Sequence, residues 1–199
     1  MKKNRIVTIS REFGSGGRTI GRKLAEELGV PCYDSELIGE IARESGFAEA
    51  YVRRAEESSP SGWAGALFST NRAFGPTNED YLWEVQRRVI LELAEKGPCV
   101  IVGRCADYIL RDEPNVLKVF VHAPLDQRIR RAREEYGAAE DNLESYVIRQ
   151  DKARAAYHNY FAAGRWGQSR EYDLCVNSRI GIDASVQVIQ AAAEAIMEA

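Results

Sequence analysis

One glycine-rich stretch constrains the fold of this 199-residue chain more than any other feature. It reads SREFGSGGRTIGRKLAEEL, from Ser10 to Leu28, with glycines at 14, 16, 17 and 21. The preceding run, Ile6–Ile9, is short and β-branched, which is typical of a strand buried on both faces of a parallel sheet. After the glycines, Ile20, Leu24 and Leu28 recur every fourth residue, as in an amphipathic helix. The stretch therefore predicts a strand, a tight loop and a helix.

A loop of this kind favours phosphate, because backbone N–H groups and the positive end of the helix dipole converge on one point. The phosphate-loop pattern G-x-x-x-x-G-K-[ST] fits if Gly17, Arg18 and Thr19 take its last three places. Glu12 then replaces the first glycine, and Arg18 replaces the lysine. The rival dinucleotide pattern G-x-G-x-x-G finds Thr19 at its third glycine, so we expect a nucleoside triphosphate rather than NAD. The alternative is a plain strand-to-helix turn.

Composition bounds the class of protein. At ~150 residues per domain, the length favours a single domain over residues 1–199. A net charge of −3 provides no bulk field to attract nucleic acid. There is no apolar run of ~18 residues to span a membrane. The apolar run near the start of the chain is too short for a signal peptide. We expect a cytoplasmic protein with a small-molecule partner; its oligomeric state is open.

The four cysteines indicate neither a disulfide framework nor a zinc site. Cys32, Cys99, Cys105 and Cys175 have no C-x-x-C spacing. Three of them lie in or beside apolar, strand-like runs, where cysteine behaves as a small hydrophobic residue.

Further strands and helices alternate along the chain. Strands are expected at Cys32–Asp34, Cys99–Gly103, Leu117–His122 and Asp173–Asn177. Helices are expected at about 18–28, 35–46, 79–96, 125–135, 141–160 and 183–198. Alternation of this kind predicts a three-layer α/β fold with a five-stranded parallel sheet and helices on both faces.

Two connections are longer than a simple crossover requires, and long connections often carry function. The first, residues 35–98, has a Ser-, Gly-, Pro- and Asn-rich middle from Ser58 to Asn78. It predicts a substrate-binding insertion; the alternative is a surface loop whose aromatic residues, Trp63, Phe68 and Phe74, pack on the core. The second, residues 124–172, carries eight arginines and predicts a lid.

The arginines suit phosphoryl transfer, which requires positive groups around the moving phosphoryl. Arg128 and Arg131 are three apart and share a helix face, so both are expected to reach inward. Arg149 and Arg154 bracket Asp151, and the spacing predicts that Asp151 pairs with Arg154. The alternative for each arginine is a solvated helix charge.

Acidic candidates for Mg²⁺ or the accepting group are fewer. Asp34 leads because it ends the second strand, and ligands of open α/β sheets bind beyond the carboxyl ends of strands. Asp107, shortly after the third strand, is second. His122 and His158 lack a partner pattern, which favours structural roles.

These residues carry a resemblance that covers nearly the whole chain. Its blocks read ITISREFGSGGRTIGRKLAEEL, YDSELI, CVIVGRCADYIL, RIRRA, IRQDKARAAYHNYF, WG and YDLCVNS. In order and spacing they resemble the cytidylate kinase-like family, within the nucleoside monophosphate kinases of the P-loop class.

The resemblance implies a P-loop core, an acceptor-binding insertion over 35–98 and an arginine-bearing lid over 124–172. It implies ATP, Mg²⁺ and phosphoryl transfer to a nucleoside monophosphate, with CMP or dCMP as the expected acceptor. The donor phosphates would lie against Gly14, Ser15, Gly16, Gly17, Arg18, Thr19, Arg128 and Arg131. The acceptor side would comprise Asp34, Arg104 and Asp107. The catalytic group would be Arg18, Arg149, Asp151 and Arg154, and the metal ligands Thr19 and Asp34.

One departure bears on the metal. Related kinases often have an acidic residue before the Gly-Arg pair, where this chain has Val102. Mg²⁺ would then be held by Asp34, or by Thr19, waters and phosphates. Two other functions stay open: a nucleotide-binding regulatory protein without turnover, suggested by Arg18 and Val102, and a kinase of another small molecule or of a protein.

Overall fold

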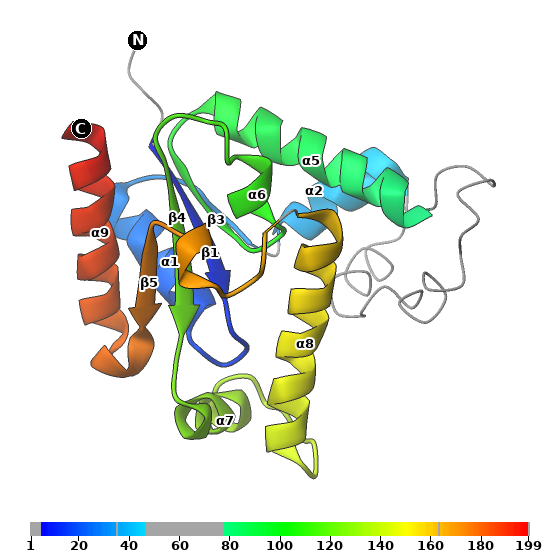
Figure 1. The fold of residues 1–199 in the computed structure, drawn as a ribbon, viewed down its shortest axis with the longest axis vertical. Helices are drawn as coiled ribbons and strands as arrows, with labels where there is room; N and C mark the ends of the chain where they lie inside the picture. The colour runs from blue at the N-terminus through cyan, green and yellow to red at the C-terminus, as the bar shows by residue number, and fades with distance from the viewer. Residues whose placement is uncertain (1–4, 35, 47–77, 163, 199) are drawn as a thin grey trace.

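The computed structural model describes residues 5–34, 36–46, 78–162 and 164–198 (Figure 1). Its centre is one five-stranded sheet in the order β2-β3-β1-β4-β5, with every neighbouring pair parallel. The strands are β1 (Ile6–Arg11), β2 (Cys32–Tyr33), β3 (Cys99–Val102), β4 (Val116–His122) and β5 (Leu174–Asn177). The predicted five-stranded parallel sheet is confirmed.

The helices follow the predicted alternation closely. They are α1 (Gly17–Leu28), α2 (Glu36–Ser45), α5 (Asn78–Lys96), α6 (Ala106–Ile109), α7 (Leu125–Glu134), α8 (Leu143–Phe161) and α9 (Ile182–Glu198), with 3₁₀ turns η2 (Ser169–Glu171) and η3 (Ser178–Ile180). Helix α8 begins two residues later than expected, because the Asn142 side chain caps it by accepting from the Ser145 amide at 2.9 Å. The short helix α6 was not predicted.

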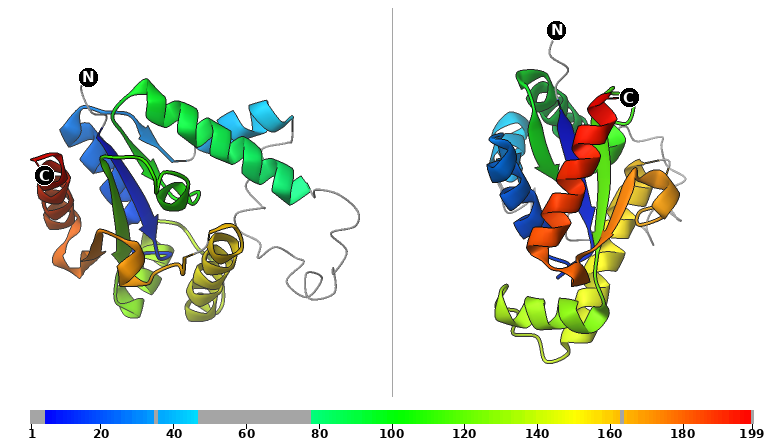
Figure 2. Two further views of the ribbon diagram at one scale, coloured as in Figure 1. Left: turned by 45° about the horizontal axis from the view of Figure 1, so that its top comes forward. Right: turned by 90° about the vertical axis from the view of Figure 1, so that its left-hand side faces the viewer.

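Two apolar cores, one on each face of the sheet, make the three layers (Figures 1 and 2). On one face, α1 and α9 pack on strand residues such as Ile9 and Val119. On the other, α2, α5 and α6 pack on residues such as Ile101. Alternate residues of β1 belong to opposite cores, since successive strand side chains point to opposite faces. Strands buried on both faces explain the unbroken apolar runs in the sequence.

The carboxyl ends of the parallel strands form one edge of the sheet, and α7 and α8 lie along it (Figure 1). The predicted lid region therefore lies at the edge where ligands of such sheets bind. The middle of the predicted insertion, with Trp63, Phe68 and Phe74, falls in residues 47–77, which lie outside the described residues.

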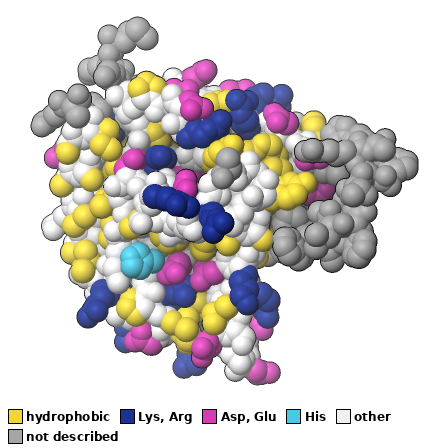
Figure 3. Space-filling view, viewed as in Figure 1, with side chains coloured by type: hydrophobic (Ala, Val, Ile, Leu, Met, Phe, Trp, Pro, Cys, Tyr) yellow, Lys and Arg dark blue, Asp and Glu magenta, His cyan; other side chains and the backbone are white. Residues whose placement is uncertain are grey.

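Surface and cysteine features agree with the composition. On the face shown in Figure 3, basic and acidic side chains are interspersed. Among the described residues, no helix is long and apolar enough to cross a membrane. All four cysteines are free thiols in the structure, and burial raises the pKa of Cys99 to about 12. The prediction of a cytoplasmic location stays a prediction.

Candidate active site

The loop after β1 requires glycine at two positions. Gly14 and Gly16 have φ angles of 76° and 81°, a left-handed region that disfavours other residues. A Cβ on Gly14 would lie 2.5 Å from the carbonyl oxygen of Arg128. A Cβ on Gly16 would lie 2.8 Å from the Ile182 side chain and 3.3 Å from the guanidinium carbon of Arg131. The glycines therefore let neighbouring elements approach the loop closely.

The loop leads directly into α1, and Gly16 caps this helix without a side-chain hydrogen bond. The first backbone N–H groups of a helix have no partner within it, so Gly17, Arg18 and Thr19 present donors at the positive end of α1. The Thr19 side chain is exposed beside them. This strand–loop–helix geometry is the one predicted, and its donors suit the phosphates of a nucleotide.

Two arginines of α7 hold the loop from outside the motif. Arg128 donates to the carbonyl of Phe13 at 3.3 Å, and its Nε lies 3.4 Å from the Glu12 carboxylate. Arg131 donates to the carbonyl of Gly14 at 2.8 Å. Both reach inward, as the sequence predicts, and their partners here are groups of the loop itself.

Asp151 corrects one prediction. It was expected to pair with Arg154, and this is wrong: its Oδ1 accepts from the Phe13 amide at 2.7 Å, and its Oδ2 pairs with Arg128. Helix spacing permits a pair with Arg154, but charge-assisted bonds to a mostly buried guanidinium and a backbone amide are stronger than a pair along the helix. Asp151 thus joins the loop to α8.

The replacement of the first motif glycine by Glu12 has a structural explanation. Its carboxylate accepts a hydrogen bond from the Ala123 amide at 3.2 Å, just after β4, and lies beside Arg128. The Ser15 hydroxyl donates to the Glu12 carbonyl at 2.9 Å, and the Ser178 hydroxyl donates to the Ser15 carbonyl at 2.6 Å. The loop is therefore held by two of its own side chains and by Ser178, which follows β5.

Arg18 occupies the place of the motif lysine and forms an ion pair with Asp34. Its Nε lies 2.6 Å from Asp34 Oδ2, and Arg22 approaches the same oxygen at 3.6 Å. The Asp34 side chain is buried, whereas about half of the Arg18 side chain is exposed. The structure thus joins a residue expected on the donor side to one expected on the acceptor side.

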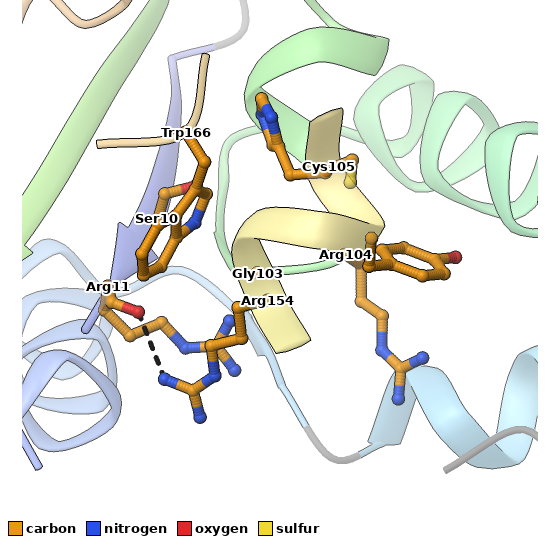
Figure 4. Close-up of a pocket in the computed structure, with 9 residues that line it drawn as sticks. Ser10, Arg11, Gly103, Arg104, Cys105, Arg154 and Trp166 are labelled. Atoms are coloured by element: carbon orange, nitrogen blue, oxygen red, sulfur yellow. Dashed lines mark hydrogen bonds between the residues drawn. The ribbon is translucent and has the colours of Figure 1, made fainter. Parts of the chain in front are cut away.

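A pocket that is open to solvent lies beside the loop and is lined by three arginines (Figure 4). Arg11 ends β1, Arg104 follows β3, and Arg154 comes from α8. Arg154 donates to the carbonyl of Arg11 at 3.1 Å, the bond dashed in Figure 4. The other lining residues are Ser10, Gly103, Cys105, Tyr157, His158 and Trp166. Three guanidinium groups in one pocket suit an anionic ligand such as a phosphate.

The turn that carries Arg104 is strained and braced. Arg104 and Cys105 have positive φ angles of 59° and 53°, which non-glycine residues adopt only where surrounding structure holds them. The Gln86 side chain donates to the Arg104 carbonyl at 3.0 Å and accepts from the Tyr157 hydroxyl at 3.3 Å. At Gly103, a Cβ would meet the Arg11 guanidinium at 2.1 Å. Helices α5 and α8 therefore fix this turn.

Two other predicted residues lie outside the pocket lining. Asp107, expected on the acceptor side, is buried behind it and lies 2.9 Å from His158 Nε2. Arg149, expected in the catalytic group, has 62% of its side chain exposed and lies 3.9 Å from Glu140. The structure brings Arg104 and Arg154 together, but it does not bring Arg149 to them.

Sequence reasoning missed Arg11, Tyr157, His158 and Trp166 as pocket residues. Arg11 was assigned to the loop, although β1 continues through it and pairs it with Val121. Trp166 follows α8 and belongs to the WG block of the family resemblance. The Gly167 amide beside it donates to the Tyr172 hydroxyl at 3.4 Å, and burial raises the pKa of that phenol. Only the position of WG beside an arginine-rich helix offered a signal.

The fold and the glycine loop together define the class of protein. A parallel sheet in the order 2-3-1-4-5, with a glycine loop joining its central strand to a helix, is that of the P-loop kinases. A shikimate kinase from Bacteroides thetaiotaomicron shares this fold, with a TM-score of 0.56 and 21% identity, over 96% of this chain and 98% of that one.

The chain belongs to the cytidylate kinase-like family, whose sequence pattern it matches over residues 6–180. It is 32% identical to a cytidylate kinase from Aeropyrum pernix over 77% of this chain and 78% of that one. It is 28% identical to a cytidylate kinase from Methanosarcina barkeri over 78% and 77%. A solved but uncharacterized protein from Eubacterium ventriosum is 30% identical, with a TM-score of 0.72, over 96% and 98%.

Proposed function

We propose that this protein transfers a phosphoryl group from ATP to a nucleoside monophosphate, with CMP or dCMP as the preferred acceptor. One observation carries the proposal: a pocket with three arginines opens beside a phosphate loop in a chain of the cytidylate kinase-like family. The loop suits the donor phosphates, and Arg11, Arg104 and Arg154 suit the acceptor phosphate.

The role that we assign to each residue follows from its place in the site. The backbone of residues 14–19 binds the donor phosphates, and Arg18 adds charge once it leaves Asp34. Arg104, on its braced turn, orients the acceptor phosphate. Arg154 lies between the loop and the pocket, since it contacts the Arg11 carbonyl and its guanidinium carbon lies 5.3 Å from the Phe13 ring centre. Such an arginine stabilises negative charge on the transferring phosphoryl.

A magnesium ion would neutralise charge on the ATP phosphates when bound. Thr19 is the available hydroxyl ligand, and Asp34 would reach the ion after releasing Arg18 or through a water. Within the described part of the chain, no cluster of three or more His, Cys, Asp or Glu side chains is placed to hold a metal. A hydroxyl from Thr19 and one carboxylate from Asp34 suit Mg²⁺, because this ion retains several waters and is held partly by phosphates.

A substrate panel tests the proposal. Purified protein is incubated with ATP, Mg²⁺ and one acceptor at a time: CMP, dCMP, UMP, AMP, shikimate or gluconate. ADP release is scored against a reaction without acceptor. We expect the highest kcat/KM with CMP or dCMP. Faster turnover of shikimate, gluconate or a purine nucleotide would overturn the acceptor assignment.

One observation favours a second candidate, a nucleotide-binding regulatory protein without turnover. Arg18 stands where the motif has the cation that contacts the donor phosphates, and here its guanidinium pairs with Asp34 instead. That candidate predicts tight ATP binding by calorimetry with no ADP release from any acceptor in the panel.

A further inference from the structure

The pair of His158 and Asp107 links the lid helix to the core of the protein. His158 lies on α8, and Asp107 lies on α6, directly after the braced turn of β3. His158 Nε2 is 2.9 Å from Asp107 Oδ2, and only about 6% of either side chain is exposed. The side chains of His158 and Asp107 are therefore joined by a buried hydrogen bond.

This pair is poorly suited to stability alone. Asp107 Oδ1 and His158 Nδ1 are buried and have no hydrogen-bond partner among the described residues. Buried polar atoms without partners cost stability, and apolar side chains of similar volume would pack here without that cost. A buried pair that carries this cost calls for an explanation beyond stability.

Position suggests what that role is. Arg154 precedes His158 by four residues, so the two side chains share a face of α8, and both line the pocket. Because the imidazole is bonded to α6, the rotation and depth of α8 are fixed where Arg154 enters the pocket. Tyr157, next to His158, makes a second link through Gln86 to the Arg104 carbonyl.

We infer that His158 is a positioning residue: through its hydrogen bond to Asp107 it docks α8 on the core and holds Arg154 in the acceptor pocket. This inference rests on the proposed phosphoryl transfer for its catalytic consequence. The positioning of Arg154 by His158 does not depend on which acceptor the protein phosphorylates.

A double-mutant cycle tests the inference. We expect His158→Leu to lower kcat by ~10-fold while the Kd for ATP stays within ~3-fold, because the phosphate loop is held by other residues. His158→Gln, which retains an N–H donor at a similar reach, should restore most of kcat. In an Arg154→Ala background, His158→Leu should cost less than ~2-fold, since the residue it positions is gone. Full additivity of the two substitutions would overturn the inference.

Leu143→Ala serves as the stability control, because Leu143 is buried at the far end of the same helix. It should lower Tm while leaving kcat near that of the parent protein. If Leu143→Ala lowered kcat as much as His158→Leu at an equal loss of Tm, general loosening of α8 would explain both, and the inference would fail.

A second readout needs no acceptor and separates this inference from the proposed function. The side-chain Nε–H resonance of Arg154, assigned by its loss in Arg154→Ala, should shift in His158→Leu and return in His158→Gln. An unmoved resonance would refute the positioning role even if CMP is a substrate. A shifted resonance would support it even if the panel finds no turnover.

Discussion

The phosphate loop and the arginine-lined pocket of Figure 4 lie at the same edge of the sheet but are built in different ways. In the loop, residues with positive φ are glycines close together in sequence, Gly14 and Gly16. In the pocket, positive φ continues from Gly103 to two non-glycine residues, Arg104 and Cys105, and the arginines come from three separate segments. The loop is thus specified locally, whereas the pocket depends on contacts between distant elements.

The charged side chains of the two regions also differ in the number of their partners. Around the loop, Arg128 is shared between Glu12, Asp151 and the Phe13 carbonyl. Beside the pocket, Asp107 and His158 contact each other, and each keeps a buried polar atom without a hydrogen-bond partner in the described chain, as does Arg128 Nε at the loop. The loop is therefore held by several contacts that share one arginine, whereas the Asp107–His158 pair rests on a single hydrogen bond.

The largest expected effect tests whether the pocket contributes to chemistry rather than to ATP binding. An arginine supplied to the transition state of phosphoryl transfer contributes ~10³-fold in rate. We expect Arg154→Ala to lower kcat with CMP by about that factor and to leave the Kd for ATP nearly unchanged. Steady-state kinetics and calorimetry measure the two constants. A kcat near that of the parent protein would remove Arg154 from the mechanism.

The second prediction concerns the loop and should show the reverse pattern. Asp151→Ala leaves the Arg128 guanidinium and the Phe13 amide without their shared carboxylate. Loss of one member of such a pair costs about 3 kcal/mol of stability. We expect a lower Tm and a raised Kd for ATP.

Asp151→Asn is the matched variant, because it keeps an oxygen for the Phe13 amide and removes only the charge. It should fall between the parent protein and Asp151→Ala in both Tm and ATP affinity. Unchanged ATP binding in Asp151→Ala, with a fall in kcat alone, would contradict the assignment of Asp151 to the loop.

Most of the fold could be predicted from the sequence because its signals are local. Apolar runs mark the strands, and a four-residue repeat marks α1. The exceptions lie where local signals mislead. Ser10 and Arg11 are polar and next to a glycine loop, yet they extend β1 by pairing with β4. Helix α6 has only four residues and follows a positive-φ turn, so it carries no periodic pattern.

The site divides in the same way. The glycine pattern identified the phosphate loop, and the number of arginines identified α7 and α8. The hydrogen-bond partners of Asp151 could not be predicted from helix spacing, because they lie 23 and 138 positions away in the sequence. The partner of His158, Asp107, is 51 positions away. Such contacts follow from the packing of α8 on the sheet edge, which no local pattern encodes.

The third prediction asks how much the loop itself contributes to chemistry. Arg18 stands where the motif lysine contacts the donor phosphates, so we expect Arg18→Ala to lower kcat by ~10²-fold. Arg18→Lys should restore part of this, since it keeps the charge but not the fork of the guanidinium. An unchanged kcat in the alanine variant would mean that the backbone of the loop suffices and that Arg18 serves only Asp34.

The smallest effect is expected at Arg149, which shares helix α8 with Arg154. Five positions on a helix of ~3.6 residues per turn separate the two side chains by about 140°, so only one of them can face the pocket. Arg154 faces it, while Arg149 is largely exposed, with Glu140 at 3.9 Å and its guanidinium carbon 5.4 Å from the Tyr146 ring centre. An exposed pair of this kind contributes at most about 1 kcal/mol. We therefore expect Arg149→Ala to change kcat less than ~3-fold, against the large loss in Arg154→Ala, when both are assayed with CMP. A fall of ~10-fold or more would show that α8 rotates during turnover and that Arg149 joins the catalytic group, as its sequence position predicts.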